Sequence, residues 1–259
     1  MMSIQPKPVA LVTGARRGIG LGIARALAAR GFDLAITDLV RDEAADAAVS
    51  ALESLGARVE FIAADLADLS GHAQTVGAVM AAFGRIDCLV NNAGIGSKVR
   101  GDFLDLEPAN YNAIFDINVR GTVFFTQAVL RAMLGRTDEG AARTIINITS
   151  VSAEMTSPER LDYCMTKAAL SSFTQGLAVR LAEEGISVFD VRPGIIRSDM
   201  TAVAAAKYDK RIAEGLVPMK RWGEPGDRGR IVAALAGGDF NFATGSIINA
   251  DGALSINRL

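Results

Sequence analysis

Tyr163 and Lys167 are the residues best suited to move a proton, and they stand four positions apart. On a helix, side chains four residues apart project from one face, about one turn from each other. A free tyrosine hydroxyl is too weakly acidic to serve as a general base at neutral pH, but a neighbouring ammonium group favours its ionised form. The pair predicts proton transfer to or from a substrate oxygen. Taken alone, a Tyr-x-x-x-Lys spacing is common by chance, and an isolated tyrosine is usually a packing residue.

A glycine-rich turn runs from Gly14 to Gly20, directly after the apolar run Val9 to Thr13 and before an amphipathic helical pattern. Gly14 permits a sharp turn, Gly18 lets the backbone approach a pyrophosphate, and Gly20 allows close helix packing. The helix that follows presents free N–H groups and the positive end of its dipole. This context predicts a dinucleotide site, although glycine-rich turns without a ligand are also common.

Asp38 ends the second β-type run, 18 positions after Gly20. A carboxylate in this place accepts hydrogen bonds from the adenosine ribose hydroxyls and repels a 2′-phosphate, so it favours NAD(H) over NADP(H). Arg16 and Arg17, in the glycine-rich turn, are either partners for such a phosphate or residues of a solvated turn, and they leave NADP(H) open.

Seven short apolar runs alternate with helical patterns along the whole chain. Such strands, each followed by a helix, predict an α/β fold with a parallel sheet covered on both faces, of the doubly wound Rossmann type. We expect one domain over residues 1–259, with its site beyond the carboxyl ends of the strands. The expected strands are Val9 to Thr13, Asp33 to Asp38, Val59 to Asp65, Cys88 to Asn92, Thr144 to Thr149, Ser187 to Val191 and Ser246 to Asn249.

Motifs spread over nearly the whole chain resemble the short-chain dehydrogenase/reductase family in type and order. They are Thr13 to Gly20, Asn91 to Gly94, Asn118, Ser150, Tyr163, Lys167 and Pro193-Gly194. The resemblance implies that Tyr163 is the general acid or base, that Lys167 also grips the nicotinamide ribose, and that Ser150 binds the substrate oxygen. It further implies that Asn118 anchors a water leading to Lys167, that hydride passes between a nicotinamide and a carbonyl carbon, and that the protein is a homotetramer.

The residues expected to bind the cofactor follow from the turn, the strand ends and the resemblance. Asp65 would meet the adenine edge, or it would cap the next helix instead. Ser198 stands where the family more often has threonine. The full set is Gly14, Arg16, Arg17, Gly18, Ile19, Gly20, Asp38, Asp65, Leu66, Asn92, Ala93, Gly94, Tyr163, Lys167, Pro193, Gly194, Ile196 and Ser198.

Within the family, the chain is most similar to the 3-oxoacyl-acyl carrier protein reductases. That subgroup commonly has a basic residue, for docking the acidic carrier, where this chain has Glu183 and Glu184, and it generally uses NADPH. Asp190 and Arg192 also depart from its pattern in the sixth strand. Our hypothesis is therefore a ketone–alcohol oxidoreductase acting on a small ketone, sugar or polyol, with carrier-bound 3-oxoacyl reduction as the alternative. A non-catalytic NAD sensor ranks below both, because Ser150, Tyr163 and Lys167 are all present.

The stretch 197–222 follows the nicotinamide turn and is the expected substrate lid. Its apolar spacing is equally typical of core or of a subunit contact. Its basic side chains either meet an anionic substrate or acidic carrier, or face solvent. The apolar residues are Met200, Val203, Tyr208, Ile212, Leu216, Met219 and Trp222, and the basic ones are Lys207, Lys210, Arg211, Lys220 and Arg221.

Composition excludes several classes of partner. With 27 basic and 29 acidic residues, the chain has no large field for nucleic acid or an anionic membrane, so we expect a small-molecule substrate and sister subunits. Two cysteines, Cys88 and Cys164, are too few for a disulfide framework and favour a reducing cytoplasm. The lone His72 lies in a polar stretch and is expected at the surface, and no bound metal is expected.

Overall fold

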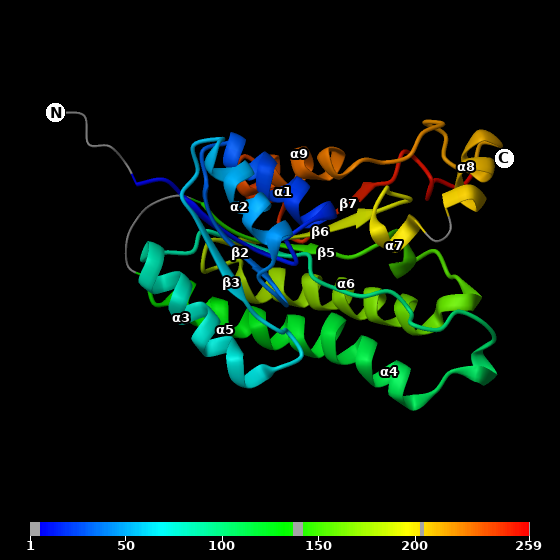
Figure 1. Cartoon of the computed structure of the whole chain (residues 1–259), viewed down its shortest axis with the longest axis horizontal. Coiled ribbons are helices and arrows are strands. Elements are labelled where there is room, and N and C mark those ends of the chain that lie inside the picture. The colour runs from blue at the N-terminus through cyan, green and yellow to red at the C-terminus, as the bar shows by residue number, and fades with distance from the viewer. Residues whose placement is uncertain (1–5, 137–141, 203–204, 259) are drawn as a thin grey trace.

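The computed structural model describes residues 6–136, 142–202 and 205–258 (Figure 1). Its described strands form one seven-stranded sheet in the order β3-β2-β1-β4-β5-β6-β7. Every neighbouring pair is parallel, so the predicted doubly wound α/β fold is confirmed. The bounds are β1 Val9–Thr13, β2 Asp33–Asp38, β3 Val59–Ala63, β4 Cys88–Asn91, β5 Arg143–Ile148, β6 Ile186–Pro193 and β7 Ile247–Ala250.

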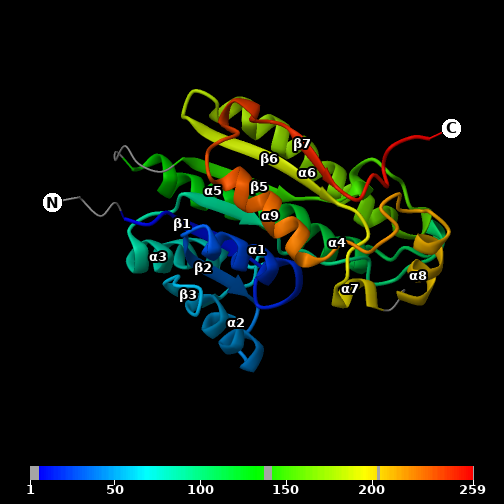
Figure 2. The same cartoon turned by 90° about the horizontal axis from the view of Figure 1, so that it is seen from above.

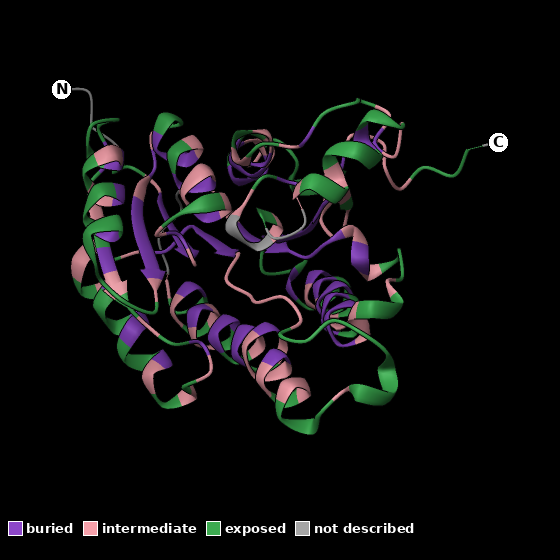
Figure 3. Cartoon of the chain, turned by 45° about the vertical axis from the view of Figure 1, so that its right-hand side comes forward, coloured by how far each residue is buried: buried purple, intermediate pink, exposed green. Residues whose placement is uncertain are grey.

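Helices cover both faces of the sheet, with α1, α2 and α9 on one side and α3, α5 and α6 on the other (Figures 1 and 2). Their buried sides line the sheet and their exposed sides face outward (Figure 3). In the part of the chain that is described, no helix has the length and apolarity needed to cross a membrane. The bounds are α1 Gly18–Ala29, α2 Glu43–Glu53, α3 His72–Phe83, α4 Pro108–Phe115, α5 Thr122–Leu134, α6 Leu161–Leu181, α7 Asp199–Ala202, α8 Ala205–Ala213 and α9 Pro225–Ala236.

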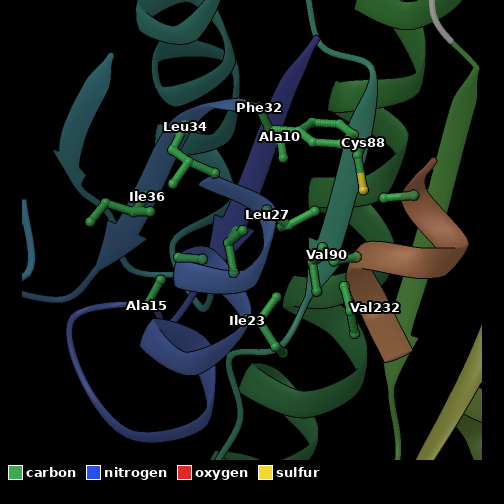
Figure 4. Packing of buried hydrophobic residues seen from close by; sticks show 14 of the residues in the cluster. Ala10, Ala15, Ile23, Leu27, Phe32, Leu34, Ile36, Cys88, Val90 and Val232 are labelled. Carbon is green, nitrogen blue, oxygen red and sulfur yellow. The ribbon is translucent and has the colours of Figure 1, made fainter. Parts of the chain in front are cut away.

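Helices α1 and α9 are packed unusually closely. A Cβ atom on Gly229 would lie 2.5 Å from the carbonyl oxygen of Gly22, so the two backbones meet where neither helix carries a side chain. Beside this contact, Ile23 and Leu27 of α1 and Val232 of α9 pack onto the sheet (Figure 4). The same packing sets Pro225, the first residue of α9, against Gly22 of α1, two residues beyond the glycine-rich turn.

The first two strands have the predicted bounds, and the other five differ from theirs by one or two residues at an end. The two largest differences have local reasons. The third strand stops at Ala63 because the chain turns at Asp65, whose Oδ1 accepts the N–H of Ala67 at 2.9 Å. The sixth strand continues to Pro193 because its last residues still pair with β7. The carboxyl ends of all seven strands lie along one edge of the sheet.

The prediction that His72 lies at the surface is wrong. Its side chain is buried, its Nε2 is 3.0 Å from the Leu66 carbonyl oxygen, and its ring meets the Phe125 ring edge-on at 5.2 Å. His72 begins α3, and Val76 and Val79 continue the same buried face one and two turns further on. The helix packing therefore decides the environment of His72, whatever the polarity of its neighbours in sequence.

Candidate active site

Ser150, Tyr163 and Lys167 meet at the carboxyl edge of the sheet. Ser150 lies two residues beyond the end of β5, and the other two lie in the first two turns of α6. All three are buried within the wall of a pocket with a volume of about 880 Å³, called here the reaction pocket. The topology thus brings together residues that the sequence separates by up to 17 positions.

Hydrogen bonds hold these side chains in place. The Nζ of Lys167 donates to the carbonyl oxygen of Ile148 at 3.0 Å and lies 5.6 Å from the centroid of the Tyr163 ring. The Oγ of Ser150 accepts the N–H of Ser152 at 3.0 Å. A positive charge and an oriented hydroxyl therefore flank the tyrosine, the arrangement needed for proton transfer to an oxygen atom.

Asn118 lies in a π-helical turn, Asp116–Gly121, between α4 and α5. Its Oδ1 accepts the N–H of Ile95 at 2.8 Å, and its Nδ2 donates to the Ile95 carbonyl oxygen at 2.9 Å and to Thr166 Oγ1 at 3.2 Å. Gly94 lies beside both Asn118 and Lys167, since a Cβ there would be 3.0 Å from Asn118 Oδ1 and 3.8 Å from Lys167 Nζ. Asn118 thus anchors the loop behind Lys167, and its role toward a water stays a prediction.

A second hollow, of about 1180 Å³, adjoins the reaction pocket and is called here the cofactor groove. Ile19, Asn92, Gly94 and Ser198 line both. Every residue predicted to bind the cofactor lines at least one of the two hollows. Apart from the four that line both, the predicted residues in the cofactor groove are Gly14, Arg16, Arg17, Gly18, Gly20, Asp38, Asp65, Leu66 and Ala93. Those in the reaction pocket are Tyr163, Lys167, Pro193, Gly194 and Ile196.

Hydrogen bonds join the glycine-rich turn to the residues that follow β4. Asn92 Nδ2 donates to the carbonyl oxygens of Thr13 and Gly14 at 2.9 and 3.0 Å. The Oγ1 of Thr13 in turn accepts the N–H groups of Asn92 and Ala93 at 3.1 and 3.0 Å. Gly18 has a φ of +57°, and a Cβ on it would meet no atom within 4 Å. The turn is thus rigid, with open space beside Gly18 where a pyrophosphate would approach.

Asp38 and Arg16 are engaged with each other. Asp38 Oδ2 accepts the Arg16 N–H at 3.3 Å, and the Arg16 Nε lies 3.8 Å from Asp38 Oδ1. The Arg16 guanidinium also hydrogen-bonds the carboxylate of Asp42. The N–H of Ala45 and the charge of Arg16 hold the pKa of the Asp42 carboxyl below its usual value. Arg16 therefore already has two carboxylate partners.

The alternative assignment of Asp65 as a helix cap is wrong. The short helical turn Leu69–Gly71 is capped by Asp68, whose Oδ1 accepts the N–H of Ser70 at 3.0 Å. Asp65 instead stays exposed at the rim of the cofactor groove.

Asp190 and Arg192, which depart from the subgroup pattern, form a buried network under the site. Asp190 accepts hydrogen bonds from Thr149, from Ser171 Oγ at 2.7 Å and from Arg192 Nε at 3.1 Å. Arg192 Nη1 reaches Glu154 Oε2 at 2.7 Å. Because Thr149 and Glu154 lie on either side of Ser150 in sequence, the network braces the loop that carries Ser150.

The stretch 197–222 forms α7, α8 and a loop beyond the end of β6 (Figures 1 and 2). Ile212, Val217 and Trp222 make a small core of their own, against which Tyr208 packs edge-on at 5.7 Å from Trp222. Tyr208 also lines the reaction pocket, so the stretch is both core and pocket wall. Val203 lies outside the described residues, and none of the basic residues predicted for this stretch lines the reaction pocket.

Sequence reasoning missed three arginines that line the reaction pocket, namely Arg100, Arg160 and Arg228. Arg228 carried a detectable signal, because it precedes Val232 and Leu235 at helical spacing and so belongs to the buried stripe of α9. Arg100 lies in a loop and Arg160 ends the short helical turn Pro158–Arg160, and neither belongs to a segment long enough for spacing to carry such a signal.

A family profile described as enoyl-(acyl carrier protein) reductase matches residues 14–255. The crystal structure of a short-chain dehydrogenase from Burkholderia cenocepacia in complex with NADP superimposes with a TM-score of 0.86, at 35% identity over 98% of this chain and 99% of that one. The chain belongs to the short-chain dehydrogenase/reductase family. Members of the family are oxidoreductases that use NAD or NADP to interconvert a ketone and an alcohol, and the predicted activity class is confirmed.

Other members of the short-chain dehydrogenase/reductase family span two kinds of substrate. A 3-oxoacyl-[acyl-carrier protein] reductase from Brucella melitensis, in complex with NAD, has a TM-score of 0.96 at 64% identity, covering 98% of this chain and 100% of that one. Galactitol 2-dehydrogenase from Agrobacterium fabrum is 35% identical over 262 residues, covering 94% of this chain and 96% of the relative.

Proposed function

We propose that this short-chain dehydrogenase/reductase uses NAD(H) to interconvert a small ketone and a secondary alcohol, with Tyr163 carrying the proton. The observation that carries the proposal is the joint placement of Ser150, Tyr163 and Lys167 in one pocket that opens into the cofactor groove.

The cofactor groove fits a dinucleotide. The turn around Gly18 and the first N–H groups of α1 would hold the pyrophosphate, Asp38 would hold the adenosine ribose, and Lys167 the nicotinamide ribose. When bound, the nicotinamide supplies or accepts the hydride.

The proton follows a short route in this pocket. In the reducing direction, Tyr163 donates its hydroxyl proton to the carbonyl oxygen while Ser150 donates a hydrogen bond to the same oxygen. The ammonium group of Lys167 stabilises the phenolate that remains. In the oxidising direction, the phenolate takes the proton back from the alcohol.

The preference for NAD(H) is supported by Asp38 and by the ion pairs that Arg16 already makes. A 2′-phosphate at the groove would meet the carboxylates of Asp38 and Asp42, and Arg16 already pairs with both. The test is steady-state turnover with NAD(H) and with NADP(H) over a panel of alcohols, sugars and ketones. Equal or better kcat/KM with NADPH would contradict the preference.

Carrier-bound 3-oxoacyl reduction is the second candidate, favoured by the 64% identity to the Brucella protein of that name. Against it stand Glu183 and Glu184, which are exposed at the end of α6 where an acidic carrier would dock. Turnover of acetoacetyl-acyl carrier protein far above that of free ketones would establish this second function and reject the first.

We further propose a homotetramer located in the cytoplasm. Helices α5 and α6 leave Phe124, Met165 and Val179 exposed by 43%, 40% and 82%, which are apolar surfaces that a second subunit would cover. Both cysteines are free and buried, as suits a reducing compartment. A mass of one chain in light scattering would contradict the tetramer.

A further inference from the structure

The charged side chains in the wall of the reaction pocket are all basic. Its wall contains four cationic side chains, Arg100, Arg160, Lys167 and Arg228. No aspartate or glutamate of the described segments lines it. A pocket wall of this kind has a positive potential that a neutral substrate would leave uncompensated.

Arg160 stands next to the reacting tyrosine. Its Cζ lies over the Tyr163 ring, 5.3 Å from the centroid, on a half-buried side chain. The one hydrogen bond that its guanidinium makes among the described residues is a long one, 3.5 Å from Nε to Ser157 Oγ. The guanidinium is therefore close enough to Tyr163 to meet a group a few bonds away from the carbon that reacts.

Arg100 approaches the same pocket from a different loop. The N–H of Gly101 donates to the carbonyl oxygen of Glu159 at 3.3 Å, which ties the loop of Arg100 to the turn of Arg160. In the segments that are described, neither guanidinium has a carboxylate within ion-pair distance. The nearby Asp162 carboxylate is held by Ser97 and by the Tyr163 N–H instead.

The three arginines of the reaction pocket lie apart from the groove expected to hold the pyrophosphate. Arg100, Arg160 and Arg228 line the reaction pocket and are absent from the wall of the cofactor groove, where Gly14 to Gly20 would hold the pyrophosphate. Arg228 adds an independent observation: its side chain is 1% exposed, and its Nε and Nη1 are buried without a hydrogen-bond partner. Buried donors without acceptors are rare and point to a ligand that supplies them.

We propose that the substrate is an anionic ketone or alcohol, whose carboxylate or phosphate group is bound by Arg160 and Arg100 while Tyr163 exchanges the proton at the neighbouring carbonyl. The proposal rests on the oxidoreductase function proposed above and specifies its substrate class. Arg228 contributes a further positive charge from the opposite, α9 side of the pocket.

Two matched pairs of ketones test the proposal with NADH. Acetoacetate is compared with methyl acetoacetate, and dihydroxyacetone phosphate with dihydroxyacetone. Each pair keeps the carbon skeleton around the ketone and removes the charge, and the two pairs separate carboxylate from phosphate. We expect the anionic member of one pair to have a kcat/KM at least tenfold above its neutral partner.

Variants then assign the effect to the arginines. In Arg160→Gln, KM for the preferred anion should rise by about 10- to 100-fold, the equivalent of one lost charge-assisted hydrogen-bonding contact. Arg160→Lys should keep part of the preference, and in both variants kcat/KM for the neutral partner should fall much less than kcat/KM for the anion. Arg180→Gln is the matched control, because Arg180 is 63% exposed on α6 and pairs with Glu184 away from the pocket. An equal loss of kcat/KM on neutral and anionic ketones would show that Arg160 acts on Tyr163 and not on the anion of the substrate, and would overturn the proposal.

Calorimetric binding of the four ketones to the enzyme–NADH complex separates this proposal from the proposed function. Tighter binding of an anion that is lost in Arg160→Gln, without any turnover, would support anion recognition and reject oxidoreduction of these compounds. Equal binding within both pairs would overturn anion recognition, even where turnover is observed.

Discussion

The buried guanidinium of Arg228 should make the protein less stable than an apolar residue at the same position would. Arg228 is 1% exposed on α9, and two of its nitrogen atoms have no acceptor. The neighbouring Asp227 is occupied by Arg221 and Arg230 at 2.6 and 2.7 Å. We therefore expect Arg228→Met, which keeps a long unbranched side chain and removes the charge, to raise the free energy of unfolding.

The size of the effect can be bounded from the burial. Burial lowers the pKa of the Arg228 guanidinium well below its ordinary value, to about 9. At about 1.4 kcal/mol for each tenfold change in an equilibrium constant, this sets an upper limit of about 5 kcal/mol on the cost of the buried charge. Relaxation and entry of water reduce such costs, so we expect about 2 kcal/mol. For a domain of this size that corresponds to a melting temperature higher by roughly 4–8 °C.

The contribution of Arg228 to the free energy of unfolding should change with pH in a definite direction. From about pH 9 up to the ordinary pKa of arginine, the unfolded chain keeps the Arg228 proton and the folded chain releases it, so the folded state gains stability as pH rises through this window. Below pH 9 both states hold the proton and the cost is constant. The stability difference between Arg228→Met and the wild type should thus be flat from pH 6 to 8 and should shrink toward pH 10.

Thermal and guanidinium-chloride unfolding of the cofactor-free protein, at one fixed protein concentration, measures this difference. Arg230→Met is the control on the same helix, because Arg230 is 74% exposed and its pair with Asp227 should contribute less than about 1 kcal/mol. If Arg228→Met melts below the wild type while Arg230→Met does not, the guanidinium is stabilising and the reasoning from its missing acceptors is refuted.

Three further predictions concern catalysis, the cofactor and the brace under Ser150. Tyr163→Phe should lower kcat by at least about 100-fold with NADH binding retained by fluorescence titration, because the proton donor is lost; near-normal turnover would remove Tyr163 from the mechanism. Asp38→Ser should lower the kcat/KM ratio of NADH to NADPH by about tenfold or more, whereas an unchanged ratio would show that Asp38 does not select the cofactor. Arg192→Met should lower the free energy of unfolding by about 3 kcal/mol, because it leaves the buried Asp190 carboxylate without its cation. In denaturant titrations, adding Asp190→Asn to Arg192→Met should recover part of the lost free energy. If the losses of the two single variants simply add in the double variant, the two residues are not paired.

The fold was predictable because the buried side of each strand and helix carries the apolar residues whose spacing identifies that element in the sequence. The runs Val9–Thr13 and Asp33–Asp38 are mostly apolar and buried, and both strands have the predicted bounds. The third strand was predicted too long because Asp65 looks like a strand end, although its side chain makes the turn that ends pairing at Ala63. Local hydrogen bonds of this kind are not visible in hydrophobic periodicity.

The motif residues of the site were predictable for a topological reason. Ser150 and Asn92 follow strands and Pro193 is the last residue of one. Parallel strands place their carboxyl ends at one edge, so spacing along the chain translates into proximity. His72 was assigned to the surface because residue type and neighbours were considered without the helix that packs on it. The π-helical turn that carries Asn118 could not be predicted either, since it shares its residue preferences with the helices on both sides.

The arginines that sequence reasoning missed share one property, which is that their surroundings come from segments distant in the chain. Arg100 and Arg160 are brought together by one backbone hydrogen bond between two loops, and Arg228 enters the pocket from a helix near the end of the chain. Charges in loops are usually solvated, so spacing alone favours that assignment. A buried, unpaired charge weakens the fold, and such costs persist where a ligand needs the group. The expected destabilisation by Arg228 and the expected anion preference of the pocket are therefore two consequences of one arrangement, and the protein should be most stable when an anion occupies it.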